Sequence, residues 1–112
     1  MKSLAAALFA FVITTSLTFA EDSPFVGTWS TDWGILVIKG SEEKLTGKYS
    51  GPFVGTIEGK VTEGEFHFVW KQTNAEWGSG VFTVSDEGKK LIGTWGGGES
   101  KTNGGPWTGT RE

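Results

Sequence analysis

Apolar and polar side chains alternate along several short runs of the chain, the pattern typical of β-strands with one buried face. The clearest run, residues 65–71, places Phe66, Phe68 and Trp70 on one face and charged or polar side chains on the other. We predict that the aromatic face is buried and that Glu65, His67 and Lys71 lie in solvent. Beyond residue 20, no stretch has a helical period.

Eight such runs follow one another, separated by turn-forming residues. They cover residues 25–31, 35–39, 44–50, 53–61, 65–71, 80–85, 90–95 and 107–111. Short strands at this spacing predict a sandwich or a barrel. Short sequential turns favour the barrel, so the predicted fold class is all-β: a small eight-stranded antiparallel up-and-down barrel. Residues 72–78 form the longest polar connection, and residues 96–106 form a Gly-rich loop.

One short motif recurs in four of these strands. It reads Val26-Gly27-Thr28-Trp29, Leu45-Thr46-Gly47-Lys48-Tyr49, Leu91-Ile92-Gly93-Thr94-Trp95 and Trp107-Thr108-Gly109-Thr110-Arg111. Glycine and the large flat group stand two residues apart, so they share one face of the strand. Occurrence near both ends of the sheet indicates a Gly-kinked meander that closes on itself.

Closure makes a specific prediction for the last strand. If this strand pairs with the first, the Arg111 guanidinium lies over the Trp29 indole and gains cation–π energy. Its donors then also satisfy backbone carbonyls at the barrel end. The alternative is that Arg111 belongs to a frayed terminus.

The first twenty residues have the composition of a secretory signal peptide. Lys2 supplies a positive start, residues 4–13 are apolar, and Ala20 precedes the expected cleavage point. A retained N-terminal anchor is the alternative. We therefore expect residues 1–20 to be a signal peptide, residues 21–112 to be a single β-barrel domain, and the mature protein to be secreted or periplasmic. No later apolar run reaches membrane-spanning length.

Composition narrows the function classes. The 18 glycines make up about twice the usual ~7%, and they occur beside six tryptophans, an aromatic content that disordered chains lack. Without cysteine, no disulfide supports the domain. A net charge of −3 and scattered basic residues argue against nucleic acid as a partner.

Residues suited to catalysis are few. His67 is the only histidine, and a metal site or a nucleophile–His–Asp triad needs more ligands or partners than it has. The carboxylate pairs Glu42-Glu43 and Asp86-Glu87 occupy turns, whereas a glycosidase needs carboxylates that converge in a cleft. We therefore expect neither an enzyme nor a metal or other cofactor.

Large aromatic side chains are the remaining candidates for function. Those expected inside the barrel are Trp29, Tyr49, Phe66, Phe68, Trp70, Phe82, Trp95 and Trp107. They either fill the core or form the walls of a cavity for a small apolar or flat ligand. Trp33 and Trp77 lie in predicted turns, where they either anchor a partner or cap the barrel ends.

The motifs at Gly27-Thr28-Trp29 and Thr108-Gly109-Thr110-Arg111 resemble the calycin superfamily, which includes lipocalins, fatty-acid-binding proteins and avidins. In that superfamily a basic residue near the end of the barrel often packs across the tryptophan of a Gly-x-Trp motif. The likeness is strongest to avidin and streptavidin, through Trp33-Gly34, residues 45–49 and the aromatic strand at 66–70. This resemblance implies a secreted ligand-binding barrel.

The residues that bind biotin in avidins are mostly not matched. Tyr49 is similar to the avidin tyrosine, but the serine positions fall on Ile35 and Gly51, and the asparagine position falls near Thr31. Biotin is therefore not the expected ligand.

These observations predict a non-catalytic binding module that takes a small apolar or flat ligand, or a protein partner or second copy, through an aromatic-lined barrel and its end loops. The candidate binding residues are Asp32, Trp33, Tyr49, Trp70, Gln72, Asn74, Trp77 and Trp95, with Trp29 and Arg111 as the closure pair. The alternative is a structural or interaction domain of the cell envelope with a filled core.

Overall fold

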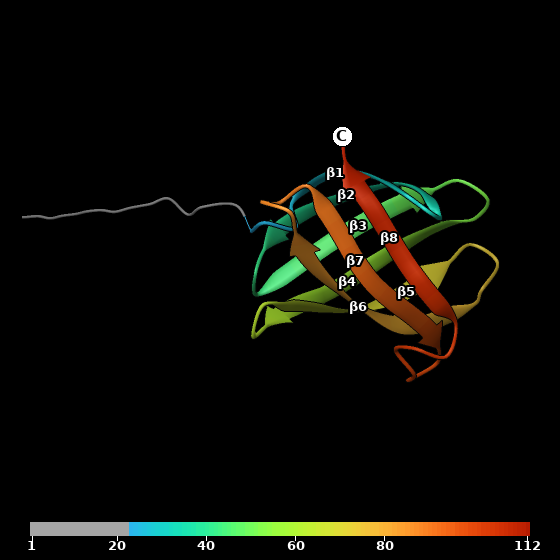
Figure 1. The fold of residues 1–112 in the computed structure, drawn as a ribbon. Helices are drawn as coiled ribbons and strands as arrows, with labels where there is room; N and C mark the ends of the chain where they lie inside the picture. The colour runs from blue at the N-terminus through green and yellow to red at the C-terminus, as the bar shows by residue number, and fades with distance from the viewer. Residues whose placement is uncertain (1–22) are drawn as a thin grey trace, which may run out of the picture.

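The computed structural model describes residues 23–112, which form a closed antiparallel barrel of eight strands in sequence order (Figure 1). The strands are β1 (Gly27–Thr31), β2 (Gly34–Ser41), β3 (Lys44–Ser50), β4 (Val54–Thr62), β5 (Glu65–Gln72), β6 (Trp77–Ser85), β7 (Lys90–Gly97) and β8 (Gly105–Arg111). The predicted fold class is thus confirmed. The predicted signal peptide lies outside the described residues.

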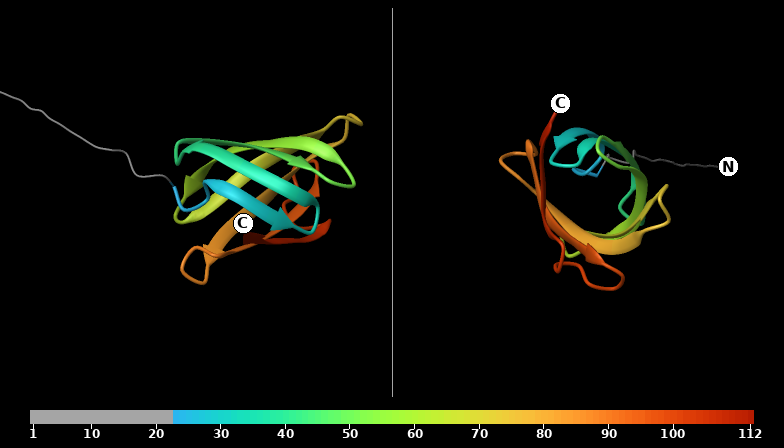
Figure 2. Two further views of the ribbon diagram at one scale, coloured as in Figure 1. Left: turned by 90° about the horizontal axis from the view of Figure 1, so that it is seen from above. Right: turned by 90° about the vertical axis from the view of Figure 1, so that its right-hand side faces the viewer.

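Each strand pairs with the next along the chain, and β8 returns to pair with β1 (Figure 2). Trp29 stands opposite Arg111 and Thr31 opposite Gly109 in this closing pair. Because the connections alternate, the turns at residues 32–33, 51–53, 73–76 and 98–104 share one end of the barrel, here called the open end. The turns at 42–43, 63–64 and 86–89 share the other, here called the plugged end.

Alternation along the strands separates core from surface as predicted. Phe66, Phe68 and Trp70 on β5 are buried, while Glu65 and Lys71 are exposed and His67 is partly exposed. The core consists of Phe25, Trp29, Leu36, Ile38, Leu45, Tyr49, Ile57, Phe66, Phe68, Trp70, Phe82, Leu91 and Trp107. Aromatic rings dominate it, with Phe68 stacked on Phe82 at a centroid distance of 4.7 Å.

The plugged end is sealed by the segment before β1. Phe25 is 2% exposed and accepts a hydrogen bond at its carbonyl from Trp29 Nε1 at 3.0 Å. Ser23, also buried, donates to Glu42 Oε2 in the β2–β3 turn at 3.0 Å. This segment therefore closes the barrel by covering its end with an aromatic ring.

The predicted Arg111 contact is present. The guanidinium carbon lies 4.2 Å from the centroid of the Trp29 ring. Its nitrogens donate to three backbone carbonyls: Nε to Gly88 at 2.7 Å, one terminal nitrogen to Val26 at 2.8 Å, and the other to Pro24 at 2.6 Å. Gly27 makes room for this side chain, because a Cβ there would collide with the guanidinium. Arg111 thus ties β8, the β6–β7 turn and the entry to β1 together.

Several predicted strand boundaries were wrong by two residues or more. The first strand begins at Gly27 rather than residue 25, the second ends at Ser41 rather than residue 39, and the seventh ends at Gly97 rather than residue 95. The sixth strand begins at Trp77 rather than at residue 80, so Trp77 lies in a strand opposite Lys71 and not in a turn. The last strand begins at Gly105 rather than Trp107. Residues up to Gly78 were predicted to form a polar connection, but Gly78 lies in the strand and makes room for a neighbouring ring. A Cβ on Gly78 would lie 2.6 Å from the Trp70 indole.

Candidate ligand-binding site

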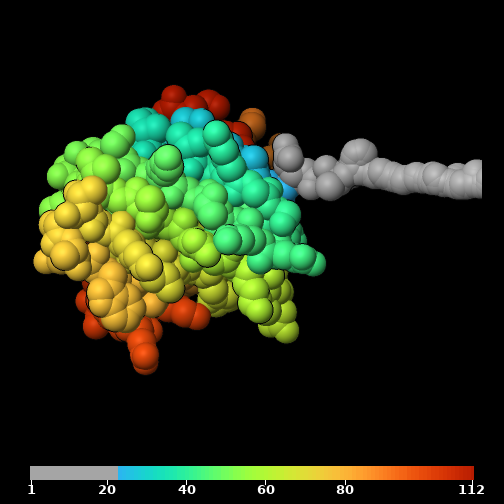
Figure 3. All heavy atoms as spheres, turned by 180° about the vertical axis from the view of Figure 1, so that it is seen from behind, coloured from blue at the N-terminus to red at the C-terminus, as the bar shows by residue number. Residues whose placement is uncertain are grey.

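A cavity of about 220 Å³ lies inside the barrel at the open end. Its lining residues are Trp33, Tyr49, Phe53, Trp70, Gln72, Glu76, Trp95 and Trp107. Trp70, Tyr49 and Trp107 belong to the buried core, whereas Phe53 is 41% exposed and Glu76 lies at the surface. The cavity therefore extends from the core to solvent. The β5–β6 loop, coloured yellow, and the β7–β8 loop, coloured orange, protrude from the barrel in the space-filling view (Figure 3).

Six of the eight lining side chains are aromatic, and they meet at steep angles. The Trp95 ring stands nearly perpendicular to Trp33, at 89° and 5.7 Å between centroids, and to Trp70, at 79° and 5.9 Å. Phe53 lies 5.8 Å from Trp33. Trp107 and Tyr49 meet at 81° and 5.2 Å deeper in the barrel. Such an arrangement presents ring faces in several directions around one small space.

Hydrogen bonds within the protein hold several of these rings in place. Trp70 Nε1 donates to the Gly96 carbonyl at 3.0 Å, and Trp107 Nε1 donates to Thr31 Oγ1 at 3.0 Å. Gly104 packs so closely on Trp95 that a Cβ would overlap the indole. The rings are thus positioned by the scaffold, which lowers the entropy cost of ordering them around a ligand.

Polar groups gather on one side of the cavity. The Tyr49 hydroxyl donates to Gln72 Oε1 at 2.8 Å, and burial raises the pKa of Tyr49 to about 12. Asn74 Oδ1 accepts hydrogen bonds from the Glu76 backbone N–H at 3.0 Å and from Gln72 Nε2 at 3.4 Å. Asn74 therefore orders the β5–β6 loop and helps to place Gln72 and Glu76 at the entrance.

Five of the eight predicted binding residues line this cavity: Trp33, Tyr49, Trp70, Gln72 and Trp95. Asn74 is not a lining residue, but it lies in the β5–β6 loop and contacts Gln72 and Glu76, which line the cavity. Asp32 serves the scaffold, because its carboxylate accepts hydrogen bonds from the Thr108 N–H at 3.0 Å and from the Thr108 hydroxyl at 3.1 Å. Trp77 is 50% exposed and is not among the lining residues.

Three lining residues were absent from the predicted set. Trp107 was expected inside the barrel, either in a filled core or in a cavity wall, and Phe53 was expected only as a strand residue. Glu76 was expected to favour binding if it gathered at one mouth of the barrel with Asp32, Tyr49, Gln72 and Asn74. The location of Phe53 and Glu76 at the cavity can be predicted from the order of the turns. In an up-and-down meander every second turn lies at the same end, so residues 32–33, 51–53 and 73–76 must surround one opening.

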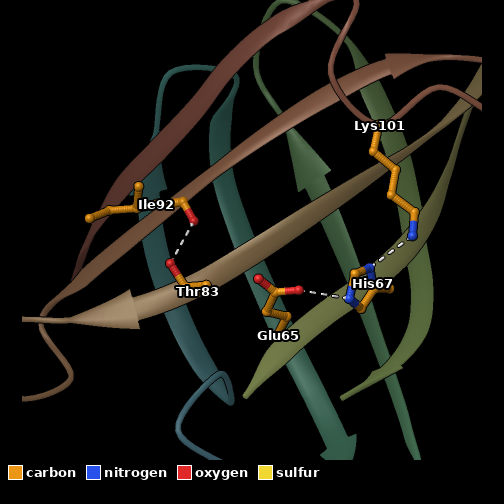
Figure 4. Close-up of polar contacts among 5 residues, drawn as sticks. All are labelled: Glu65, His67, Thr83, Ile92 and Lys101. Atoms are coloured by element: carbon orange, nitrogen blue, oxygen red, sulfur yellow. Dashed lines mark hydrogen bonds and ion pairs between the residues drawn. The ribbon is translucent and has the colours of Figure 1, made fainter. Parts of the chain in front are cut away.

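His67 lies on the outer face of β5 (Figure 4). Its Nε2 is 3.1 Å from Glu65 Oε1, and its Nδ1 is 2.9 Å from Lys101 Nζ in the β7–β8 loop. On the neighbouring strands, the Thr83 hydroxyl donates to the Ile92 carbonyl at 3.3 Å. None of these residues lines the open-end cavity. Within residues 23–112, no group of three His, Cys, Asp or Glu side chains is placed to hold a metal ion.

Comparison with protein families, curated proteins and solved structures gives no match to this chain. Among the described residues there is also no helix of the length and apolarity needed to cross a membrane. The candidate function therefore rests on the geometry of the open-end cavity.

Proposed function

We propose that this protein is a non-catalytic binding module that holds a small ligand with a flat or apolar body in the open-end cavity. The observation that carries the proposal is a cavity of about 220 Å³ lined by six aromatic rings and reaching the surface. Ligand sites are typically concave and mostly apolar, with a few placed polar groups. Tyr49, Gln72 and Glu76 supply those groups here. The volume lies below the ~300–1,000 Å³ of sites for drug-sized molecules, which favours a smaller ligand.

The alternative is a structural or interaction domain whose core is filled. The middle of the barrel and the plugged end support that alternative, because Phe25, Trp29 and Phe82 are almost completely buried. The open end supports ligand binding instead, because Trp33 and Trp95 are only partly buried and line a cavity that reaches the surface. We therefore favour binding.

As part of the same hypothesis, we propose that the protein is related to calycins and that the mature protein is exported. Support comes from the Arg111 guanidinium, which lies 4.2 Å from the Trp29 ring centroid, as the resemblance to that superfamily implies. The barrel shape alone is shared by many unrelated functions. The Gly-x-Trp and basic-residue pair therefore carries the proposed relationship.

Ligand-observed NMR with a panel of neutral fragments tests the binding proposal. Indole and cyclohexanol represent flat and bulky apolar bodies. We expect at least one of them to bind the wild-type protein and to bind the Trp33→Leu variant more weakly. Trp77→Leu is the matched control, because Trp77 is exposed on a strand outside the cavity. Absence of binding by every fragment, or equal binding to Trp33→Leu, contradicts the proposal.

A further inference from the structure

The residues that line the open-end cavity carry negative charge and no positive charge. Of its eight lining residues only Glu76 is ionisable at neutral pH, and its charge is negative. Lys48 and Lys71 each adjoin a lining residue in sequence, but both are exposed on the outer face of their strands, opposite in direction to the buried Tyr49 and Trp70. Among the described residues, no lysine or arginine lines the cavity. An anionic ligand would find no opposite charge here.

The aromatic rings add to this preference. The face of an aromatic ring carries partial negative charge, so a cation is attracted to it electrostatically, and most strongly to tryptophan. Four of the lining residues are tryptophans. Trp95 stands nearly perpendicular to both Trp33 and Trp70, so indole rings of different orientation line the space. Ring surfaces set at right angles can contact a compact, roughly spherical cation from several sides at once.

Hydrogen-bond donors in the cavity are partly occupied. Trp70 and Trp107 donate their indole N–H groups to Gly96 and Thr31, and Tyr49 donates its hydroxyl to Gln72. These side chains therefore present mainly ring carbon atoms to a ligand, and not free hydrogen-bond donors. A cation without N–H groups, such as a quaternary ammonium group, needs no acceptor from the wall, whereas a primary ammonium group would depend on the few acceptors of the lining, chiefly Gln72 and Glu76.

We propose that the ligand of the open-end cavity is a small organic cation with a methylated ammonium group, held by the tryptophan faces and attracted by Glu76. This inference rests on the proposed function, because it assigns a ligand class to the same site. Glu76 lies at the entrance, where its carboxylate contributes mainly long-range attraction that salt weakens. The tryptophans supply most of the affinity.

Isothermal titration calorimetry with two probes of the same shape tests the proposal. Choline carries a trimethylammonium group, and 3,3-dimethyl-1-butanol replaces its nitrogen by carbon and removes the charge. We expect choline to bind about tenfold more tightly than the neutral probe, in line with the cation–π contribution at desolvated sites. Trp33→Leu should remove most of this preference, and Glu76→Gln should reduce choline binding several-fold at low salt only. Trp77→Leu should leave both affinities unchanged.

The outcomes separate the ligand class from the existence of the site. Equal binding of both probes, or tighter binding of 3,3-dimethyl-1-butanol, overturns the cation proposal and leaves the binding function in place. Binding of neither probe also overturns the cation proposal, and the neutral fragment panel then judges the function independently. Choline binding that Trp33→Leu does not weaken overturns the assignment to this cavity. Trp33 is partly exposed in a turn, so the Trp33→Leu variant should remain folded. Thermal denaturation of the variant checks this.

Discussion

The two ends of this barrel use the same kind of residue in opposite ways. At the plugged end Trp29 is completely buried, donates its indole N–H to Phe25, and lies under the Arg111 guanidinium. At the open end Trp33 and Trp95 are partly exposed and stand around a space of about 220 Å³. A tryptophan whose faces are all covered contributes to stability, whereas one with an uncovered face is available to a ligand.

Connectivity explains why the ends differ. The chain enters the barrel at the plugged end, so residues 23–26 and the last residue of β8 are available to cover it. Among residues 23–112, the open end has only hairpin loops, which extend away from the strands (Figure 1). Stability and binding are therefore assigned to different residues, and variants should affect one or the other.

The largest expected effect concerns the core that both ends share. Phe68→Ala should lower the free energy of unfolding by about 3–5 kcal/mol, because it removes a buried ring that stacks on Phe82. Phe53→Ala makes the same substitution at the open rim, where the ring is 41% exposed, and should cost about 1 kcal/mol or less. Chemical denaturation of both variants measures the difference. Similar losses would show that the open rim is as tightly packed as the core.

The closure pair should show a smaller but coupled effect. In a double-mutant cycle, Arg111→Ala and Trp29→Phe should be non-additive by about 0.5–2 kcal/mol, because each removes one partner of the contact. Arg111→Lys should recover only part of the loss, since an ammonium group cannot reproduce the donors that reach Gly88, Val26 and Pro24. Strictly additive losses of stability would show that the Arg111 and Trp29 side chains do not interact energetically.

A pH-dependent effect is expected at the boundary between core and cavity. Tyr49 is the only tyrosine, so phenolate absorbance reports its ionisation alone. The folded protein should show a pKa of about 12 instead of the ordinary 10.0. Because the folded-state pKa is raised, the stabilisation that Tyr49 contributes is complete below pH 10 and falls as the pH rises from about 10 to 12.

Tyr49→Phe is the control for that titration. The variant has no phenol, so its stability should lack the part of the alkaline decline that belongs to Tyr49. A titration midpoint near 10.0 in the folded wild-type protein would show that water reaches the hydroxyl freely, and that the Tyr49–Gln72 contact is not maintained.

Much of the fold was predictable from the sequence because period-two alternation and the repeated Gly-aromatic motif are local signals. Closure was predictable because Arg111 and Trp29 each lie on a strand face that follows from that alternation. The start of β6 was not predictable by the same means. Gly78 resembles a turn residue in isolation, and only the Trp70 ring and the Gly96 carbonyl on the two adjacent strands explain why a side chain is excluded there.

The candidate site was predictable in part for a related reason. Tyr49 and Trp70 point inward by strand alternation, which the sequence displays. Phe53 and Glu76 lie in loops, where no period assigns a direction, and they reach the cavity because their turns share an end of the barrel. The prediction for Trp77 was wrong for a different reason. Trp77 pairs with Lys71 in a strand, so its side chain lies on the outer surface rather than at the cavity.

The central claim, that ligand binding is confined to the open end, is tested most directly by the indole N–H signals of the six tryptophans in a proton–nitrogen NMR titration with choline. Four of these residues line the cavity: Trp33, Trp70, Trp95 and Trp107. Trp29 lies under Arg111 at the plugged end, and Trp77 lies on the outer surface. The account predicts saturable shifts of the four cavity signals with Trp29 and Trp77 unchanged. Shifts centred on Trp29 or Trp77 would contradict it, as would the absence of a shift at any tryptophan with choline and with the neutral fragments alike.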